Sequence, residues 1–275
     1  FKQKTAYEML RSLVGSEMCI RDRRSLQIMV VLDVSNSMRA SDLPPSRLQQ
    51  AKWGVRDLIR QLQGDRIGLV VFAGSAFLHC PLTSDYAAFL LTLDEVYPGV
   101  IPRGGTAIAR ALREAIAHFD DEGDSDRVIV LITDGEDHEE DPVALVPTLK
   151  EKGIRVYAVG VGTPEGELIV MPDGSFLKDR EGRVVKTRLV EEPLKNLALK
   201  TGGVYVRAVP GDFGLEQLYR DYISRLTRRE HEERLAKVPQ EQFGWFVLGA
   251  WVWLAAEALI APASRPMAAR IRKKP

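Results

Sequence analysis

The chain has 275 residues, which is enough for one large domain or for one domain with a membrane anchor. Its hydrophobic fraction of 45% and charged fraction of 28% are those of an ordinary globular protein. Thirty-eight basic residues balance 38 acidic ones, so no overall positive field indicates a nucleic-acid partner. Two cysteines, Cys19 and Cys80, are too few for a disulfide framework or a thiolate metal site.

Residues 1–23 resemble a translated sequencing-adapter peptide of the kind found at the ends of some gene predictions. They contain neither the apolar core of a signal peptide nor a clear helical period. We therefore expect residues 1–23 to be a non-native leader and the folded domain to begin at residue 24. The alternative is a native amphipathic leader. If the leader is not native, we expect that the true N-terminus is missing, together with any membrane segment in it.

From residue 25 the chain alternates short apolar runs with amphipathic stretches of helical period. Strands are predicted at residues 26–32, 66–72, 76–80, 128–133, 155–161 and 204–207. Helices are predicted to begin at residues 46, 84, 106, 141, 192 and 215. The polar segment 163–187, with glycines at 174 and 182, predicts a loop that contains a hairpin.

This alternation predicts a doubly wound α/β fold, in which helices cover both faces of a mainly parallel sheet. In such sheets ligands bind beyond the carboxyl ends of the strands, at the point where the strand order reverses. Asp33 and Asp134 both lie at the ends of predicted strands. We therefore expect the functional site at this edge of the sheet.

Oxygen-bearing side chains gather around these two carboxylates in the sequence. Asp33, Ser35 and Ser37 follow the first strand, Thr106 follows a glycine pair before a helix, and Asp134 precedes a glycine turn. Carboxylate and hydroxyl oxygens are the ligands that Mg²⁺ prefers. The alternative for the first three is a simple turn or helix cap.

The order of these residues resembles the metal-ion-dependent adhesion site of von Willebrand factor type A domains. Segments 64–81 and 133–139 resemble the Bat-type, or aerotolerance-operon, branch of that family, whose members are membrane-anchored bacterial proteins. The resemblance extends over residues 26–260. It implies an A domain at residues 24–237 and a Rossmann-like sheet.

The resemblance also implies a ligand set for Mg²⁺ or Mn²⁺. Asp33, Ser35, Ser37 and Thr106 are expected to bind the ion directly, and Asp134 mainly through water. An open position on the ion can then accept a carboxylate from a partner protein. The residues expected at the rim that meets the partner are Asn36, Gly105, Glu136 and Asp137.

Members of the Bat-type branch are associated with MoxR-type AAA+ ATPases. The resemblance therefore implies a membrane complex with such an ATPase and with other von Willebrand factor A proteins. The chain itself lacks the G-x-x-x-x-G-K-[ST] motif of a P-loop ATPase.

The apolar run at residues 243–261 contains a single charge, Glu257, and predicts a C-terminal transmembrane helix. The alternative is a buried core helix. The tail at residues 262–275 is basic, so the positive-inside tendency predicts that it is cytoplasmic. The A domain would then lie on the outer, periplasmic side of the inner membrane.

These observations favour a metal-dependent protein-interaction domain without catalytic residues. A Mg²⁺-dependent hydrolase or phosphotransferase with Asp33 as nucleophile is the alternative, although the sequence provides no convincing general base near it. A structural subunit with a metal-free site is a third reading.

Overall fold

The computed structural model describes residues 26–120, 125–136, 140–179, 181–224, 226 and 243–260. The chain divides into two compact units, residues 1–230 and residues 231–275. The expected leader at residues 1–23 and the expected basic tail at residues 262–275 lie outside the described residues.

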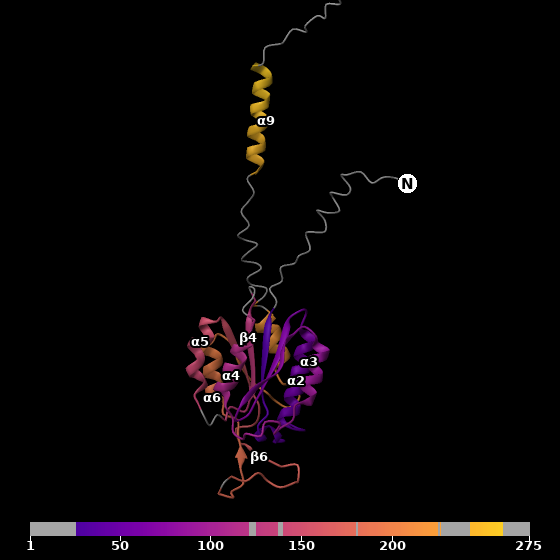
Figure 1. Ribbon diagram of the computed structural model, residues 1–275, viewed down its shortest axis with the longest axis vertical. Helices are drawn as coiled ribbons and strands as arrows, with labels where there is room; N and C mark the ends of the chain where they lie inside the picture. The colour runs from indigo at the N-terminus through magenta and orange to yellow at the C-terminus, as the bar shows by residue number, and fades with distance from the viewer. Residues whose placement is uncertain are drawn as a thin grey trace, which may run out of the picture. The chain divides into compact units, whose positions relative to one another are not determined.

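The first unit is built on one six-stranded sheet with the strand order β3-β2-β1-β4-β5-β8 (Figure 1). Its strands are β1 (Gln27–Asp33), β2 (Arg66–Phe72), β3 (Ala76–Thr83), β4 (Arg127–Thr133), β5 (Ile154–Gly160) and β8 (Tyr205–Arg207). All neighbouring strands are parallel except β2 and β3, which are antiparallel. The prediction of a mainly parallel sheet is confirmed.

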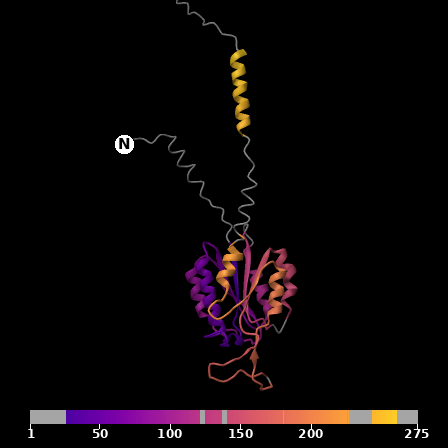
Figure 2. The same ribbon diagram turned by 180° about the vertical axis from the view of Figure 1, so that it is seen from behind.

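Helices cover both faces of the sheet, as Figures 1 and 2 show. One face packs against α2 (Arg47–Gln61), α3 (Tyr86–Glu95), α7 (Leu215–Leu218) and the π-helical turn η4 (Tyr219–Ile223). The other face packs against α4 (Ile108–Ala117), the 3-10 turn η3 (Pro142–Leu145), α5 (Val146–Glu151) and α6 (Glu191–Lys200). The doubly wound architecture follows from this arrangement.

The central strand β1 shows why two layers of helices are needed. Successive side chains of a strand point to opposite faces, so Val30 joins one hydrophobic core and Met29 and Val31 join the other. Every residue of β1 is buried. A strand that is apolar on both faces requires helices on both faces.

Local signals define where several helices begin. The Ser46 hydroxyl accepts a hydrogen bond from the backbone N–H of Gln49 at 3.2 Å, which caps the first turn of α2. Asp141 caps the 3-10 turn η3 in the same way, through the N–H of Val143 at 2.9 Å, and α5 continues from that turn.

One strand is longer than predicted. The sequence predicts that Pro81 ends the third strand, yet β3 continues through it to Thr83. Because β3 is an edge strand, a residue without a backbone N–H can be accommodated there without loss of a ladder hydrogen bond.

The second unit contains helix α9 (Phe243–Ile260), which coincides with most of the transmembrane helix predicted at residues 243–261. Among the helices that the structure describes, none is long and apolar enough to cross a membrane. The predicted membrane span is therefore not found among the described helices.

We predict that Leu58→Ala lowers the free energy of unfolding by about 2–5 kcal/mol, because Leu58 of α2 is fully buried in the core and its loss leaves a cavity. Leu91→Ala, at a side chain of α3 that is 69% exposed, is expected to change it by less than about 0.5 kcal/mol. Urea denaturation of the purified chain measures both. Equal effects would contradict the assigned core.

Candidate metal centre

The candidate site lies where the strand order of the sheet reverses. β1 lies between β2 and β4, so the chain leaves β1 toward one side of the sheet and later returns to its other side at β4. Asp33 ends β1, and Asp134 directly follows β4. Both carboxylates are fully buried at the carboxyl edge of the sheet, where ligands of doubly wound folds bind.

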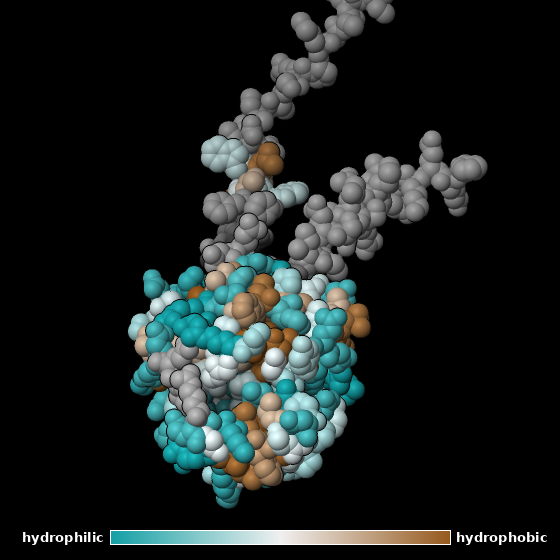
Figure 3. Space-filling model, turned by 60° about the horizontal axis from the view of Figure 1, so that its bottom comes forward, coloured by the Kyte–Doolittle hydropathy of each residue, from teal (hydrophilic) through white to brown (hydrophobic). Residues whose placement is uncertain are grey.

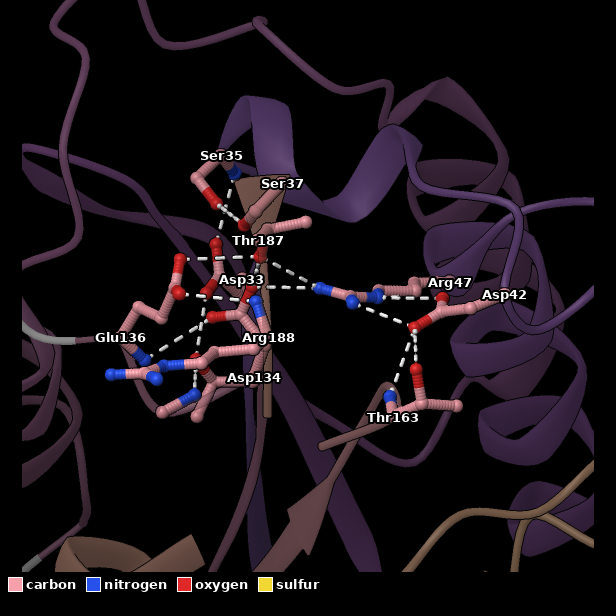
Figure 4. A network of polar contacts seen from close by, with 12 residues as sticks. Asp33, Ser35, Ser37, Asp42, Arg47, Asp134, Glu136, Thr163, Thr187 and Arg188 are labelled. Atoms are coloured by element: carbon pink, nitrogen blue, oxygen red, sulfur yellow. Dashed lines mark hydrogen bonds and ion pairs between the residues drawn. The ribbon is translucent and has the colours of Figure 1, made fainter. Parts of the chain in front are cut away.

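The first loop turns sharply out of β1. Asp33 Oδ1 accepts a hydrogen bond from the N–H of Ser35 at 2.9 Å, and the chain then enters the 3-10 turn η2 (Asn36–Arg39). This turn brings Ser37 back over Ser35, and their Oγ atoms lie 2.7 Å apart (Figure 4). Both serines are buried. The loop therefore gathers one carboxylate and two hydroxyls.

The loop that carries Thr106 is held against the end of β2. Ala107 donates its N–H to the carbonyl oxygen of Ala73 at 2.8 Å, and Gly74 donates to the carbonyl oxygen of Arg103 at 3.1 Å. The backbones approach so closely that a Cβ on Gly74 would lie 2.2 Å from the carbonyl oxygen of Gly104. Because β2 pairs with β1, this contact fixes Thr106, which is itself buried, at the same edge as Asp33.

Asp134 is paired with a buried cation. Arg47 of α2 donates from Nη1 to Asp134 Oδ2 at 3.0 Å, and neither side chain is exposed to solvent. The same Nη1 donates to Thr187 Oγ1 at 3.0 Å, and Thr187 Oγ1 lies 3.0 Å from Asp134 Oδ2. Asp42 holds the other side of the guanidinium through two hydrogen bonds of 2.8 and 2.7 Å (Figure 4).

A tight turn follows Asp134. Gly135 has a φ of +76°, which favours glycine, and a Cβ there would lie 2.2 Å from the carbonyl oxygen of Val190. Val190 donates its N–H to the carbonyl oxygen of Asp134 at 2.8 Å. The glycine is therefore needed both for the turn and for close packing against the start of α6.

Comparison with known proteins places this arrangement in a family. Residues 28–136 match the von Willebrand factor type A domain family. The structure is similar to that of the conserved hypothetical protein BatB from Bacteroides thetaiotaomicron, with 38% identity and a TM-score of 0.72 over 74% of this chain and 100% of that one. An aerotolerance-related membrane protein from Bacteroides fragilis is similar at 38% identity and a TM-score of 0.69, over 73% of this chain and 100% of that one.

The chain belongs to the von Willebrand factor type A domain family and is of the Bat type. Among curated relatives, a UPF0353 protein of Mycolicibacterium paratuberculosis is 30% identical over 82% of this chain and 66% of its own length. An uncharacterized protein of Borreliella burgdorferi is 28% identical over 77% of this chain. The Bat-type chain spans about 60% of the length of that relative.

A more distant likeness concerns the fold alone. Proximal thread matrix protein 1 from the mussel byssus, whose structure has a zinc-occupied adhesion-site motif, shares 20% identity with the Bat-type chain at a TM-score of 0.52. The likeness covers 82% of this chain and 51% of that one.

The electrostatics of the Bat-type site are dominated by Asp33. Burial, and then the nearby charge of Asp134, raise the pKa of Asp33 from 3.8 to about 7. Hydrogen bonds from the Thr133 hydroxyl at 2.7 Å and from the N–H of Ser35 stabilise the charged form, but they do not offset the burial. A cation bound beside Asp33 would reduce the free-energy cost of keeping its buried carboxylate charged.

The donor atoms fit a small hard cation. The described residues contain no group of three His, Cys, Asp or Glu side chains that could hold a metal. Instead, two carboxylates and three hydroxyl side chains meet at one edge. Neighbouring ligands of an octahedral Mg²⁺ lie about 3.0 Å apart when the bonds are ~2.1 Å. The Oγ atoms of Ser35 and Ser37, 2.7 Å apart, are close to that spacing.

The predicted rim residues differ in their surroundings. Asn36 is half-buried and accepts a hydrogen bond from Arg39 Nε at 3.2 Å, whereas Gly105 is exposed. Glu136 turns toward the segment 163–187 and accepts from the N–H of Arg188 at 3.1 Å (Figure 4). Asp137 lies outside the described residues.

The sequence analysis missed the polar residues that support the site. These are Asp42, Arg47, Thr133, Thr163 and Thr187. One feature of the sequence could have indicated the role of Arg47. Arg47 occupies the first turn of α2, where the helix dipole disfavours a positive charge, so a nearby anion was to be expected.

We predict that Asp33→Asn stabilises the metal-free chain at pH 8 more than at pH 5. Because the folded-state pKa of Asp33 is raised, the wild type loses stability as pH rises from about 4 to about 7. The advantage of the variant should be about 2–3 kcal/mol larger at pH 8. Urea denaturation in EDTA at both pH values measures it.

The matched control is Asp57→Asn, at a half-exposed side chain of α2 that pairs with Arg60 at 2.8 Å, where loss of the surface pair should change the free energy of unfolding by about 1 kcal/mol or less. If the stabilisation by Asp33→Asn does not depend on pH, the charged form of Asp33 does not destabilise the metal-free fold.

Proposed function

We propose that this Bat-type domain binds Mg²⁺ or Mn²⁺ and, through the ion, a carboxylate of a partner protein. The observation that carries the proposal is the pairing of Asp134 with Arg47 beside a set of hydroxyl ligands. Asp33, Ser35, Ser37 and Thr106 would hold the ion directly, with Asp134 behind them.

The proposal follows from the charges of the site. The charge of Asp134 is already offset by Arg47, at 3.0 Å, so among the five proposed ligand residues Asp33 is the one whose charge is left to neutralise a divalent cation. Hydroxyl ligands carry no charge. A bound cation supplies a Lewis-acidic position that favours an external anion, and a glutamate or aspartate side chain is the anion that a protein partner can offer.

The surroundings support a protein partner. Helix α4 begins two residues after Thr106, and the partial positive charge of its N-terminus favours an anion nearby. Figure 3 shows hydrophobic patches among hydrophilic ones on the face viewed from the lower end of Figure 1. Non-obligate interfaces are about as apolar as the rest of a protein surface, so this mixed face is compatible with a protein partner.

The alternative enzyme reading is disfavoured by Asp33 itself. A nucleophilic carboxylate must reach its substrate, but Asp33 is fully buried. One of its oxygens accepts from Ser35 N–H and the other from the Thr133 hydroxyl. These contacts suit a fixed metal ligand better than an attacking group.

We extend the proposal to the cellular setting. A related protein from Bacteroides fragilis is an aerotolerance-related membrane protein, which supports a role at a membrane. The inner membrane, with the A domain on its outer side, is the location we propose. The exposed Trp251, Trp253 and Leu254 of α9 offer an apolar contact for a membrane. Other von Willebrand factor A proteins and a MoxR-type AAA+ ATPase are the proposed partners. Recovery of the chain in the soluble fraction without detergent would contradict the membrane role.

We predict that the purified chain binds one Mg²⁺ or Mn²⁺ in calorimetry and that Asp33→Ala abolishes the heat of binding. Gly74→Ala should weaken the affinity about tenfold, because its Cβ would push away the loop that carries Thr106. Gly104→Ala is the control, since a Cβ there meets nothing within 4 Å and the variant should bind like the wild type. Equal affinity of wild type and Asp33→Ala would refute the metal site.

We predict that Thr106→Ala reduces capture of a membrane-extract partner in Mg²⁺ to the level seen with EDTA. The free energy of unfolding of the Thr106→Ala variant should differ from that of the wild type by about 1 kcal/mol or less, because only one small side chain is truncated. Replacing the acidic residues of the captured protein, one at a time, should identify one carboxylate that is needed. Undiminished capture in EDTA would show that recognition uses another surface.

A further inference from the structure

The segment 163–187, here called the insert, projects from the carboxyl edge of the sheet, and Figure 1 shows its strand β6 below the rest of the domain. It consists of the short pair β6 (Glu167–Leu168) and β7 (Lys186–Thr187) with two further bridges beyond it. The two ends of the insert, Thr163 and Thr187, lie at its base. Both make polar contacts with the network around Arg47.

Arg47 reaches both ends of the insert through short contacts. Asp42, which holds the guanidinium by two hydrogen bonds, also accepts from the N–H and the hydroxyl of Thr163 at 2.9 and 3.1 Å. On the other side, Arg47 Nη1 donates to Thr187 Oγ1 at 3.0 Å. Figure 4 shows Arg47 between Asp42 and the cluster of Asp134 and Thr187.

The guanidinium has little freedom to move. Arg47 is fully buried, and a Cβ on Gly162 would lie 2.7 Å from its Cζ, so the backbone that leads into the insert packs directly on it. A buried cation that forms hydrogen bonds to two carboxylates is held in one geometry, because moving it would leave charges unpaired. The position of the insert base and the position of Asp134 are therefore set by the same group.

We propose that Arg47 is a positioning residue that couples the metal site to the insert. It engages Asp134 Oδ2 and the insert base together, so that a metal that stabilises this position of Asp134 also stabilises the insert base against opening. The inference rests on the proposed metal function. Thr187 is its most direct link, because its hydroxyl contacts Arg47, Asp134 and Glu136.

Coupling of this kind is reciprocal. If Mg²⁺ protects the insert from opening by some factor, an anchored insert must raise the affinity for Mg²⁺ by the same factor. A variant that cuts the link should therefore lose both effects together. A purely structural role of the network would lower stability without changing the response of the insert to metal.

The test is hydrogen exchange of residues 164–186 in the purified full chain, with Mg²⁺ and with EDTA, together with Mg²⁺ calorimetry. In wild type we expect Mg²⁺ to slow exchange in the insert severalfold. Thr187→Val keeps the shape of the side chain and removes its hydroxyl. It should raise insert exchange roughly tenfold in EDTA, abolish the slowing by Mg²⁺ and weaken Mg²⁺ binding by the factor measured for that slowing.

Arg47→Lys is the second variant, because it keeps the charge beside Asp134 but cannot form the paired hydrogen bonds to Asp42. It should also lose the response of the insert to Mg²⁺. The matched control is Ser175→Ala, which removes a hydroxyl that donates to Asp173 Oδ1 at 2.7 Å on the exposed part of the insert. This control should keep the wild-type response and affinity.

Two results would overturn the inference in distinguishable ways. If wild type binds Mg²⁺ but insert exchange does not change, or if Thr187→Val keeps the full response, the coupling is wrong while the metal site stands. If wild type shows no heat with Mg²⁺ or Mn²⁺, the proposed function fails and the coupling fails with it.

Discussion

Two carboxylates, Asp33 and Asp134, are buried near each other at the ends of neighbouring strands. Their electrostatic repulsion explains most of the polar contacts of the site. Like charges in a protein interior are costly unless they are neutralised or protonated. Arg47 neutralises one of them at 3.0 Å. Asp33 accepts hydrogen bonds from the Thr133 hydroxyl and the N–H of Ser35, but burial and then the nearby charge of Asp134 still raise its pKa to about 7. The site is therefore electrostatically incomplete on the side of Asp33.

The residues around Asp33 do not neutralise its charge. The serines after β1 and the threonine before α4 contribute oxygens without charge, and backbone hydrogen bonds fix the loops that carry them. A third carboxylate in the same position would satisfy a cation fully. With hydroxyls, a bound cation keeps an excess of positive charge, which is a physical basis for recognition of an acidic partner.

Arg47 also explains why the insert belongs to the site. Its guanidinium has donors on several sides, and the structure uses them toward a carboxylate of the site, a carboxylate of the preceding loop and the base of the insert. A lysine could not make these contacts at once. The similarity to BatB places the sheet and its site loops in a known family, whereas the contacts of Arg47 suggest how one part of this chain can respond to another.

The sequence by itself determined the layered fold and the nature of the donor set. Apolar runs such as residues 26–32 predict buried strands because side chains alternate between faces, and residues at strand ends must lie at one edge of a parallel sheet. The helix starts at Ser46 and Asp141 were also readable, since capping involves residues only two or three positions apart.

Only the tertiary structure decided which distant groups meet. Arg47 and Asp134 are 87 residues apart, and Thr187 and Asp134 are 53 apart, so no local period relates them. The raised pKa of Asp33 likewise depends on burial that two packed layers of helices create. The continuation of β3 through Pro81 depends on its place at the sheet edge. Local patterns specify elements, but burial and long-range pairing arise only when those elements are packed together.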